Sequence, residues 1–178
     1  MTNSDRIFSD FLRTQLEEGL ALAQQSDIVD LIPLGDGERS PDRYIVRFHA
    51  KCLVRPSHGT VTESTRFDVG IWFPEHYLRQ IDPLLIVTLL HPAHVWHPNV
   101  KTPAICLGHV VPGTSLVDLV FQSYEILTYQ NWAAHDGLNP EACQWARNHQ
   151  DRFPVDGRPL KRRALKIRTE PVARKEAL

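Results

Sequence analysis

The sequence predicts a single α+β domain with an N-terminal helix, a four-stranded antiparallel meander, an irregular loop and two C-terminal helices. Apolar residues recur every three or four positions near the N-terminus and again after residue 115, as in helices that bury one face. Between these segments, apolar and polar residues alternate in runs that turn-forming residues separate, as in half-buried strands. This order of elements is typical of an α+β layer arrangement.

The first helix is predicted over residues 4–25, where the apolar residues form one stripe. They are Ile7, Phe8, Phe11, Leu12, Leu16 and Leu20. Strands are predicted over residues 27–34, 44–54, 66–73 and 84–90. The turn signal Gly35-Asp36-Gly37 joins the first two strands, because glycine adopts positive φ without steric cost. Cys52 falls on the apolar face of the second strand and is expected in the core.

After the fourth strand, residues 91–113 have little periodicity and are rich in His, Pro and Gly, which is typical of a loop laid across a domain face. Ser115 is a suitable N-cap for the next helix. Asn139 followed by Pro140 indicates the start of the last helix, because Asn caps free N–H groups and Pro is favoured at the first helical position. Cys143 on that helix is expected to pack in the core.

The composition suits one globular domain and argues against a largely disordered chain or a coiled coil. The chain has 178 residues, of which 42% are hydrophobic and 23% charged. Its longest apolar run is far shorter than the roughly 20 residues that span a bilayer, and its N-terminus is charged, so we expect a cytoplasmic protein that does not bind membranes. Three cysteines with no paired spacing fit a reducing compartment.

Charge is distributed unevenly. Residues 151–178 hold 9 basic and 4 acidic residues, which leaves residues 1–150 with a net charge of −6. We therefore expect a domain over residues 1–153 and a basic, flexible tail over residues 154–178. The tail either keeps the protein in solution or docks on an acidic partner. Nucleic acid is the weaker candidate partner, because no aromatic residue follows Phe153 to stack on bases.

Three motifs in the second half of the chain carry a resemblance to a known family. They are Trp96-His97-Pro98-Asn99, Ile105-Cys106-Leu107 and His135-Asp136-Gly137-Leu138-Asn139-Pro140-Glu141-Ala142. Their order and spacing resemble those of ubiquitin-conjugating enzymes, in which a His-Pro-Asn turn precedes the catalytic cysteine and an acidic residue precedes a Leu-x-Pro-Glu-Ala helix start. The resemblance covers most of residues 4–153. It implies the ubiquitin-conjugating fold.

The residue types suit acyl transfer. Cys106 is the one cysteine in the irregular loop, and a thiolate accepts an acyl group by exchange from another thioester. The Asn99 amide either donates a hydrogen bond to the oxyanion or ties the turn to its own backbone, and His97 is expected to hold that turn. A lysine acceptor with an ordinary pKa of about 10.4 must lose a proton. Asp136 either assists that loss, with His135 beside it, or begins a turn.

The resemblance also implies partners. An activating enzyme would dock on the first helix near Arg6 and Arg13, and load a ubiquitin-like modifier onto Cys106 for transfer to a lysine or another nucleophile of a protein target. No cofactor is implied. The resemblance further implies a divergent, bacterial member, of the kind found in operons with an activating enzyme, a ubiquitin-like modifier and a metallo-isopeptidase, some of which act in antiphage defence.

Several departures point to a divergent member with unfamiliar partners. Leu78 stands where the family's Phe-Pro-x-x-Tyr-Pro connection has its second Pro, and Gly108 replaces an acidic residue. No Trp occurs between Val110 and Leu116, where the family has a Trp-Ser-Pro element. The connection also lacks the residues on which eukaryotic ligases bind.

Three other functions are open on the sequence. A zinc site could use residues from the irregular loop, but Pro92 and Pro98 prevent the helix that would align the histidines. The candidate zinc ligands are His91, His94, His97, Cys106 and His109. A cysteine hydrolase would pair Cys106 with His97, His109 or His135 and with Asp136. A scaffold of the same fold would bind the modifier without catalysis, although Cys106 in register argues against it.

Overall fold

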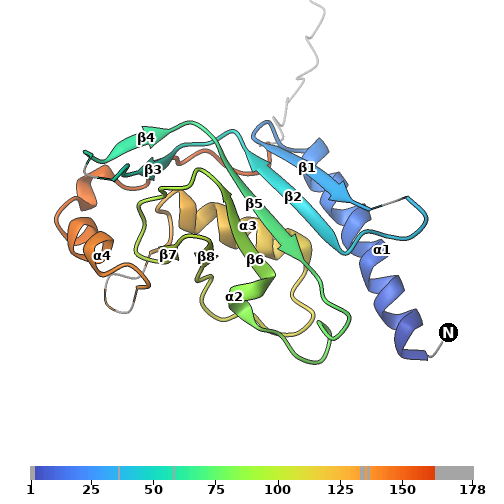
Figure 1. Ribbon diagram of the computed structural model, residues 1–178. Coiled ribbons are helices and arrows are strands. Elements are labelled where there is room, and N and C mark those ends of the chain that lie inside the picture. Colours follow the sequence, from blue (N-terminus) through green and yellow to red (C-terminus); the bar gives the residue numbers. More distant parts are fainter. Residues whose placement is uncertain (1–2, 36, 58, 133–134, 136, 163–178) are drawn as a thin grey trace, which may run out of the picture.

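Figure 1 shows the protein as a computed structural model, which describes residues 3–35, 37–57, 59–132, 135 and 137–162. The predicted α+β class is confirmed. Helix α1 (Asn3–Gln24) and helix α3 (Leu116–Leu127) both lie on one side of an antiparallel sheet, and the short helix α4 (Pro140–Arg147) lies at the end of the molecule away from the N-terminus. In the described part of the chain, no helix has the length and apolar character needed to cross a membrane.

The main sheet contains the predicted meander. Its strand order is β1-β2-β5-β6-β8-β7, and every neighbouring pair is antiparallel. The bounds are Val29–Leu34 for β1, Arg43–Phe48 for β2, Phe67–Trp72 for β5, Val87–His91 for β6, Val100–Lys101 for β7 and Ala104–Ile105 for β8. A separate hairpin pairs β3 (Cys52–Val54) with β4 (Thr62–Ser64).

Two predicted strands are wrong in their bounds. The predicted strand over residues 44–54 is interrupted after Phe48, and the Lys51 amide donates to the Asp156 carboxylate at 3.0 Å rather than to a neighbouring strand. The strand predicted to begin at Leu84 begins at Val87, because residues 83–86 form the short helix α2 (Pro83–Ile86). Asp82 caps this helix by accepting a hydrogen bond from the Leu84 amide.

Two groups of buried side chains stabilise the fold. The first, here called the main core, lies between the sheet and helices α1 and α3; Phe48 and Val69 are fully buried in it, and Leu119 joins them from α3. The second, here called the minor core, lies beside α4 and joins segments far apart in the sequence. It consists of Leu53, Trp96, Tyr129, Ala142 and Ala146.

Residues 154–162 pack against the body of the protein, which differs from the expectation of a flexible tail from residue 154 onward. Leu160 is only 3% exposed and joins the main core. The Val155 amide donates to the Thr128 carbonyl, and Asp156 accepts hydrogen bonds from Arg158 and the Lys51 amide. Burial alone would raise the pKa of Asp156, but these hydrogen bonds outweigh it and lower the pKa. The rest of the predicted tail, residues 163–178, lies outside the described residues.

Candidate active site

A short hairpin brings Asn99 and Cys106 together. Val100 of β7 pairs with Ile105 of β8, so the residues just outside this pair lie opposite each other at the open end of the hairpin. The Cys106 amide donates to the Asn99 carbonyl at 2.8 Å, and the Asn99 side-chain amide reaches the Cys106 carbonyl at 3.4 Å. Two residues seven positions apart therefore share one site, and the Asn99 carboxamide lies next to the backbone of the candidate nucleophile.

The hairpin is fixed to the edge of the main sheet. Thr88 of β6 pairs with Ala104 of β8, and the Leu89 amide donates to the Pro103 carbonyl at 2.8 Å. Thr102 also donates from its hydroxyl to the Ala93 carbonyl. A sheet-bound scaffold positions a loop side chain more rigidly than a free loop would.

The three cysteines differ in accessibility. Cys106 is partly exposed, whereas Cys52 and Cys143 are buried. Burial raises the pKa of the Cys52 thiol to about 12, so this thiol stays protonated near neutral pH. The predictions that Cys52 and Cys143 lie in the core are confirmed. Among the three thiols, Cys106 is the one that a partner protein can reach.

His97 is completely buried and holds the turn before Asn99. Its Nδ1 accepts a hydrogen bond from the Asn99 amide at 3.0 Å, so the neutral ring carries its proton on Nε2. That Nε2 has no hydrogen-bond partner among the described residues. Burial lowers the pKa of His97 to about 3. This ring is therefore neutral near pH 7 and is suited to fixing the turn.

Trp96 is held by two neighbouring segments of the minor core. Its amide donates to the Leu53 carbonyl, and its carbonyl accepts the Tyr129 hydroxyl at 2.5 Å. The Tyr129 ring lies edge-on to His97, with ring centroids 4.2 Å apart, and stacks on Phe153. Tyr129 follows α3 with a φ of 60°, a left-handed conformation that is unfavourable for a bulky side chain. Its contacts to Trp96 and His97 keep it there.

The start of α4 is joined to the His-Pro-Asn turn. The Asn139 amide donates to the Pro98 carbonyl at 3.0 Å, and the Asn139 side chain caps the helix by accepting from the Ala142 amide. Gly137 approaches so closely that a Cβ there would lie 2.6 Å from the Pro98 oxygen and 2.5 Å from Cys143 Sγ. The segment that begins at Gly137 therefore lies against the turn that holds Asn99.

Of the remaining predicted site residues, those that the structure describes lie at the surface. His135 is exposed, and Asp136 lies outside the described residues. Arg6 and Arg13 are both exposed on α1, where Arg13 also pairs with Asp10 at 3.1 Å. They are accessible to a partner protein, as docking of an activating enzyme on this helix would require.

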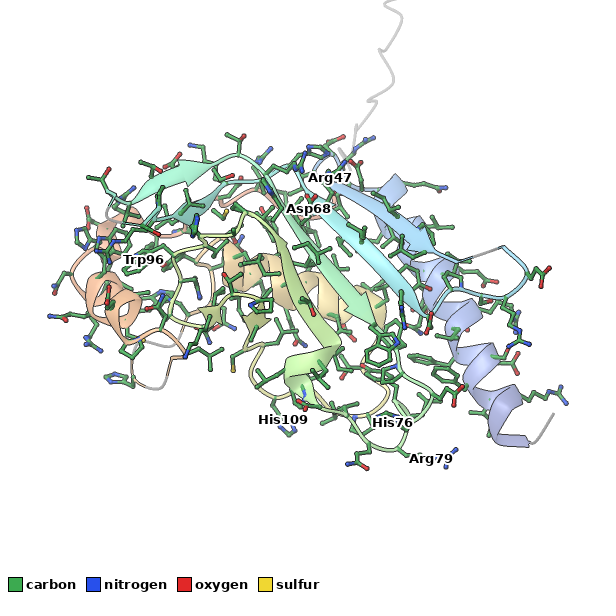
Figure 2. The ribbon with its side chains drawn as sticks, viewed as in Figure 1. Arg47, Asp68, His76, Arg79, Trp96 and His109 are labelled. Carbon is green, nitrogen blue, oxygen red and sulfur yellow. The ribbon has the colours of Figure 1, made fainter. Side chains whose placement is uncertain are left out.

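The described residues contain no group of three or more His, Cys, Asp or Glu side chains that could hold a metal ion. Figure 2 shows His109 at the lower edge of the view, well apart from Trp96. This placement separates two of the histidines that a zinc site would have combined, because His97 directly follows Trp96.

Sequence reasoning missed two features of the site. The first is the β7–β8 hairpin, which a local pattern could have predicted. Two short segments, Val100-Lys101 and Ala104-Ile105, flank the two-residue turn Thr102-Pro103 and pair with each other. The role of Tyr129 carried no such signal, because a tyrosine after a helix end has no pattern that predicts a left-handed conformation.

Comparison of the chain with protein-family models finds no match, and comparison with curated proteins finds no similar sequence either.

Proposed function

We propose that this chain is a ubiquitin-like conjugating enzyme with the ubiquitin-conjugating fold. In the first step, the Cys106 thiolate attacks the thioester carbonyl carbon of a modifier carried by an activating enzyme. A carbon–sulfur bond to Cys106 forms as the bond to the activating enzyme's cysteine breaks, and that cysteine leaves as a thiolate. Exchange of one thioester for another needs no cofactor.

In the second step, an amine of the target attacks the modifier carbonyl, and the Cys106 thiolate leaves. The amine must lose a proton, which passes to the Asp136 carboxylate or to water. Charge that builds on the carbonyl oxygen would be stabilised by the Asn99 side-chain amide, an effect whose loss costs about 10²–10³-fold in rate in comparable sites.

The observation that carries the proposal is the pairing of Asn99 with Cys106 at the open end of the β7–β8 hairpin. The structure offers a partly exposed thiol there, a side-chain amide within 3.4 Å of the cysteine backbone and a buried His97 that fixes the turn. The α+β architecture, with a helix before an antiparallel meander and two helices after it, supports the same proposal. A thiol in the core would have argued against it.

The first step is tested by charging, that is, by loading the modifier onto Cys106 as a thioester. The chain is incubated with a candidate activating enzyme, the ubiquitin-like modifier of that enzyme and ATP, and the products are separated without reductant. We expect an adduct that a thiol reagent removes. Cys106→Ala should form none, and Cys106→Ser should form an oxyester that resists thiols. Cys143→Ala, which alters a buried thiol, should charge normally. An adduct of unchanged yield in Cys106→Ala would contradict the proposal.

The second step, here called discharge, is the transfer of the modifier from Cys106 to an amine, and it is tested separately. Asp136→Ala should charge at the normal rate and discharge to free lysine more slowly by about 10²-fold or more, because the attacking amine loses its general base. Asp151→Ala, which removes an exposed carboxylate from the 3₁₀ turn Gln150–Arg152, is the control and should discharge normally. Unchanged discharge by Asp136→Ala would remove the proposed role of this residue.

A further inference from the structure

Arg55 joins three segments that surround the candidate site. It follows β3, and its amide donates to the His94 carbonyl at 2.9 Å. Its guanidinium lies 4.5 Å from the centre of the Trp96 ring, and its Nη1 contacts Glu141 in the first turn of α4 at 2.9 Å. One side chain therefore bridges the residue before the His-Pro-Asn turn and the start of the last helix.

Stability alone does not account for this arrangement. The Arg55 side chain is 37% exposed and that of Glu141 is 77% exposed, so water screens the ion pair and its contribution to folding is small. A planar guanidinium can stack on an indole ring and bind a carboxylate at the same time, which a lysine ammonium does less well. The geometry suits a side chain that orients the segment of Trp96 relative to the start of α4.

We propose that Arg55 is a positioning residue for the transfer step. This inference depends on the proposed function, because it concerns the geometry of the second reaction. The start of α4 is tied to the turn through the hydrogen bond from the Asn139 amide to the Pro98 carbonyl. Arg55 provides a second link between the same two segments, from Trp96 to Glu141. Together the two links fix the residues that follow Asp136 relative to the turn that holds Asn99.

The consequence is specific to one step. Charging needs the Cys106 thiol and a docking surface for the activating enzyme on α1, whereas the contacts of Arg55 are with His94, Trp96 and Glu141. Transfer also needs the amine, its base and the carbonyl in one arrangement, and misplacement by about 1 Å costs up to about 10²-fold in rate. Loss of Arg55 should therefore slow discharge and leave charging unchanged.

The experiment measures both steps in single-turnover assays of the full chain. We expect Arg55→Ala to charge at the wild-type rate and to discharge to free lysine about tenfold more slowly. Glu141→Gln, which removes the charge of the ion pair but keeps an oxygen that can accept from Arg55, should have a smaller effect in the same direction. Arg55→Lys should recover part of the rate, because it retains the charge but not the planar group.

The matched control is the ion pair between Lys51 and Glu63. Lys51 directly precedes β3 and Glu63 lies on β4, both side chains are about half exposed, and their N–O distance is 2.8 Å. Lys51→Ala should discharge normally. An equal loss of discharge in Lys51→Ala and Arg55→Ala would show a general effect of the hairpin and would overturn the inference.

A second measurement does not need the activating enzyme. Hydrogen exchange at the Asn139 and Ala142 amides should become faster in Arg55→Ala, whereas exchange at Leu119 in α3 should not change. Unchanged exchange at Asn139 together with normal discharge would overturn the inference while leaving the proposed function intact. Failure of the wild-type protein to charge would instead overturn the proposed function, and exchange would still report whether Arg55 fixes α4.

Discussion

The main core and the minor core are built in different ways. In the main core, large side chains from one sheet face and two helices pack together, and Phe48 and Phe67 stack with ring centroids 4.7 Å apart. In the minor core, five buried residues come from segments between Leu53 and Ala146. There the contacts are single hydrogen bonds, such as that from Tyr129 to Trp96, and ring contacts such as that of Tyr129 with His97.

The difference indicates that the main core stabilises the fold, whereas the minor core fixes the positions of particular residues. Burial of apolar area is nondirectional and stabilises the whole fold, whereas a hydrogen bond to a chosen carbonyl fixes one position. The minor core contains the residues around the His97 turn and the first turns of α4. Substitutions in the main core should therefore reduce stability most, and those in the minor core should act more on the geometry of the candidate site.

The largest effect is expected in the main core. Phe48→Ala removes a fully buried ring that stacks on Phe67 and Tyr124, and should lower the free energy of unfolding by about 3–5 kcal/mol. Urea denaturation followed by far-UV circular dichroism measures the change. A loss smaller than that of the minor-core variants below would contradict the division between the two cores.

The next effect comes from His97 and depends on pH. Burial lowers the pKa of His97 from 6.5 to about 3, so below pH 6.5 the unfolded chain binds a proton that the folded protein does not accept until about pH 3. The stability that the neutral ring permits is present above pH 6.5 and is lost as pH falls through this window. Between pH 7 and pH 5 the loss from His97 should be about 2 kcal/mol.

Urea denaturation at the two pH values, in wild type and in His97→Gln, separates this contribution from that of other groups. The variant should be less stable at pH 7 and should lose less stability on acidification. His97→Asn is the second variant if glutamine does not fit the site. Equal pH dependence in wild type and both variants would show that His97 titrates normally.

A smaller effect is expected from one hydroxyl group. Tyr129→Phe keeps the ring contacts with His97 and Phe153 but leaves the Trp96 carbonyl without its 2.5 Å donor. The loss of stability should be about 1–2 kcal/mol, and discharge of the modifier should slow more than charging. Tyr77→Phe is the control, because its hydroxyl also donates to a carbonyl, that of Thr114, but in the main core. Discharge by Tyr77→Phe should be unaffected.

The smallest change in stability is expected at Gly137. A Cβ there meets the Pro98 carbonyl, so Gly137→Ala must displace the segment before α4, at a cost of about 1 kcal/mol. Discharge should slow while charging remains normal. Gly157→Ala adds a methyl group whose nearest neighbour is Pro154 Cγ at 3.6 Å, and should alter neither step. Similar kinetics for the two variants would contradict the close approach of Gly137.

Periodicity predicted the parts of the fold that nondirectional burial determines. The helix α1, the alternation in β2 and the caps at Ser115 and Asn139 all depend on neighbours in sequence, and each is confirmed. The predicted apolar stripe of α1 is wrong at Ile7 and Leu20, which are exposed. The interruption after Phe48 depends on Asp156, more than a hundred residues away, which no local pattern contains. The helix at Pro83 had a local signal, because Asp82 before Pro83 is a cap, but its apolar run favoured a strand.

In the candidate site, too, local motifs predicted some residues, and others meet only through tertiary contacts. The motif placed Asn99 and Cys106 in one loop, and the register of β7 with β8 supplies the contact between them. Arg55, Tyr129 and Glu141 meet Trp96 or each other only in the folded chain. Their roles follow from tertiary contacts, which single-sequence patterns do not encode.

The central claim is that Cys106 carries a modifier as a thioester. Mass spectrometry of the charged full-length protein, before and after hydroxylamine, tests it most directly. We predict a mass increase of one modifier minus one water, located on the peptide that contains Cys106 and lost on treatment with hydroxylamine. A hydroxylamine-resistant adduct, or one located on Cys52 or Cys143, would contradict the account.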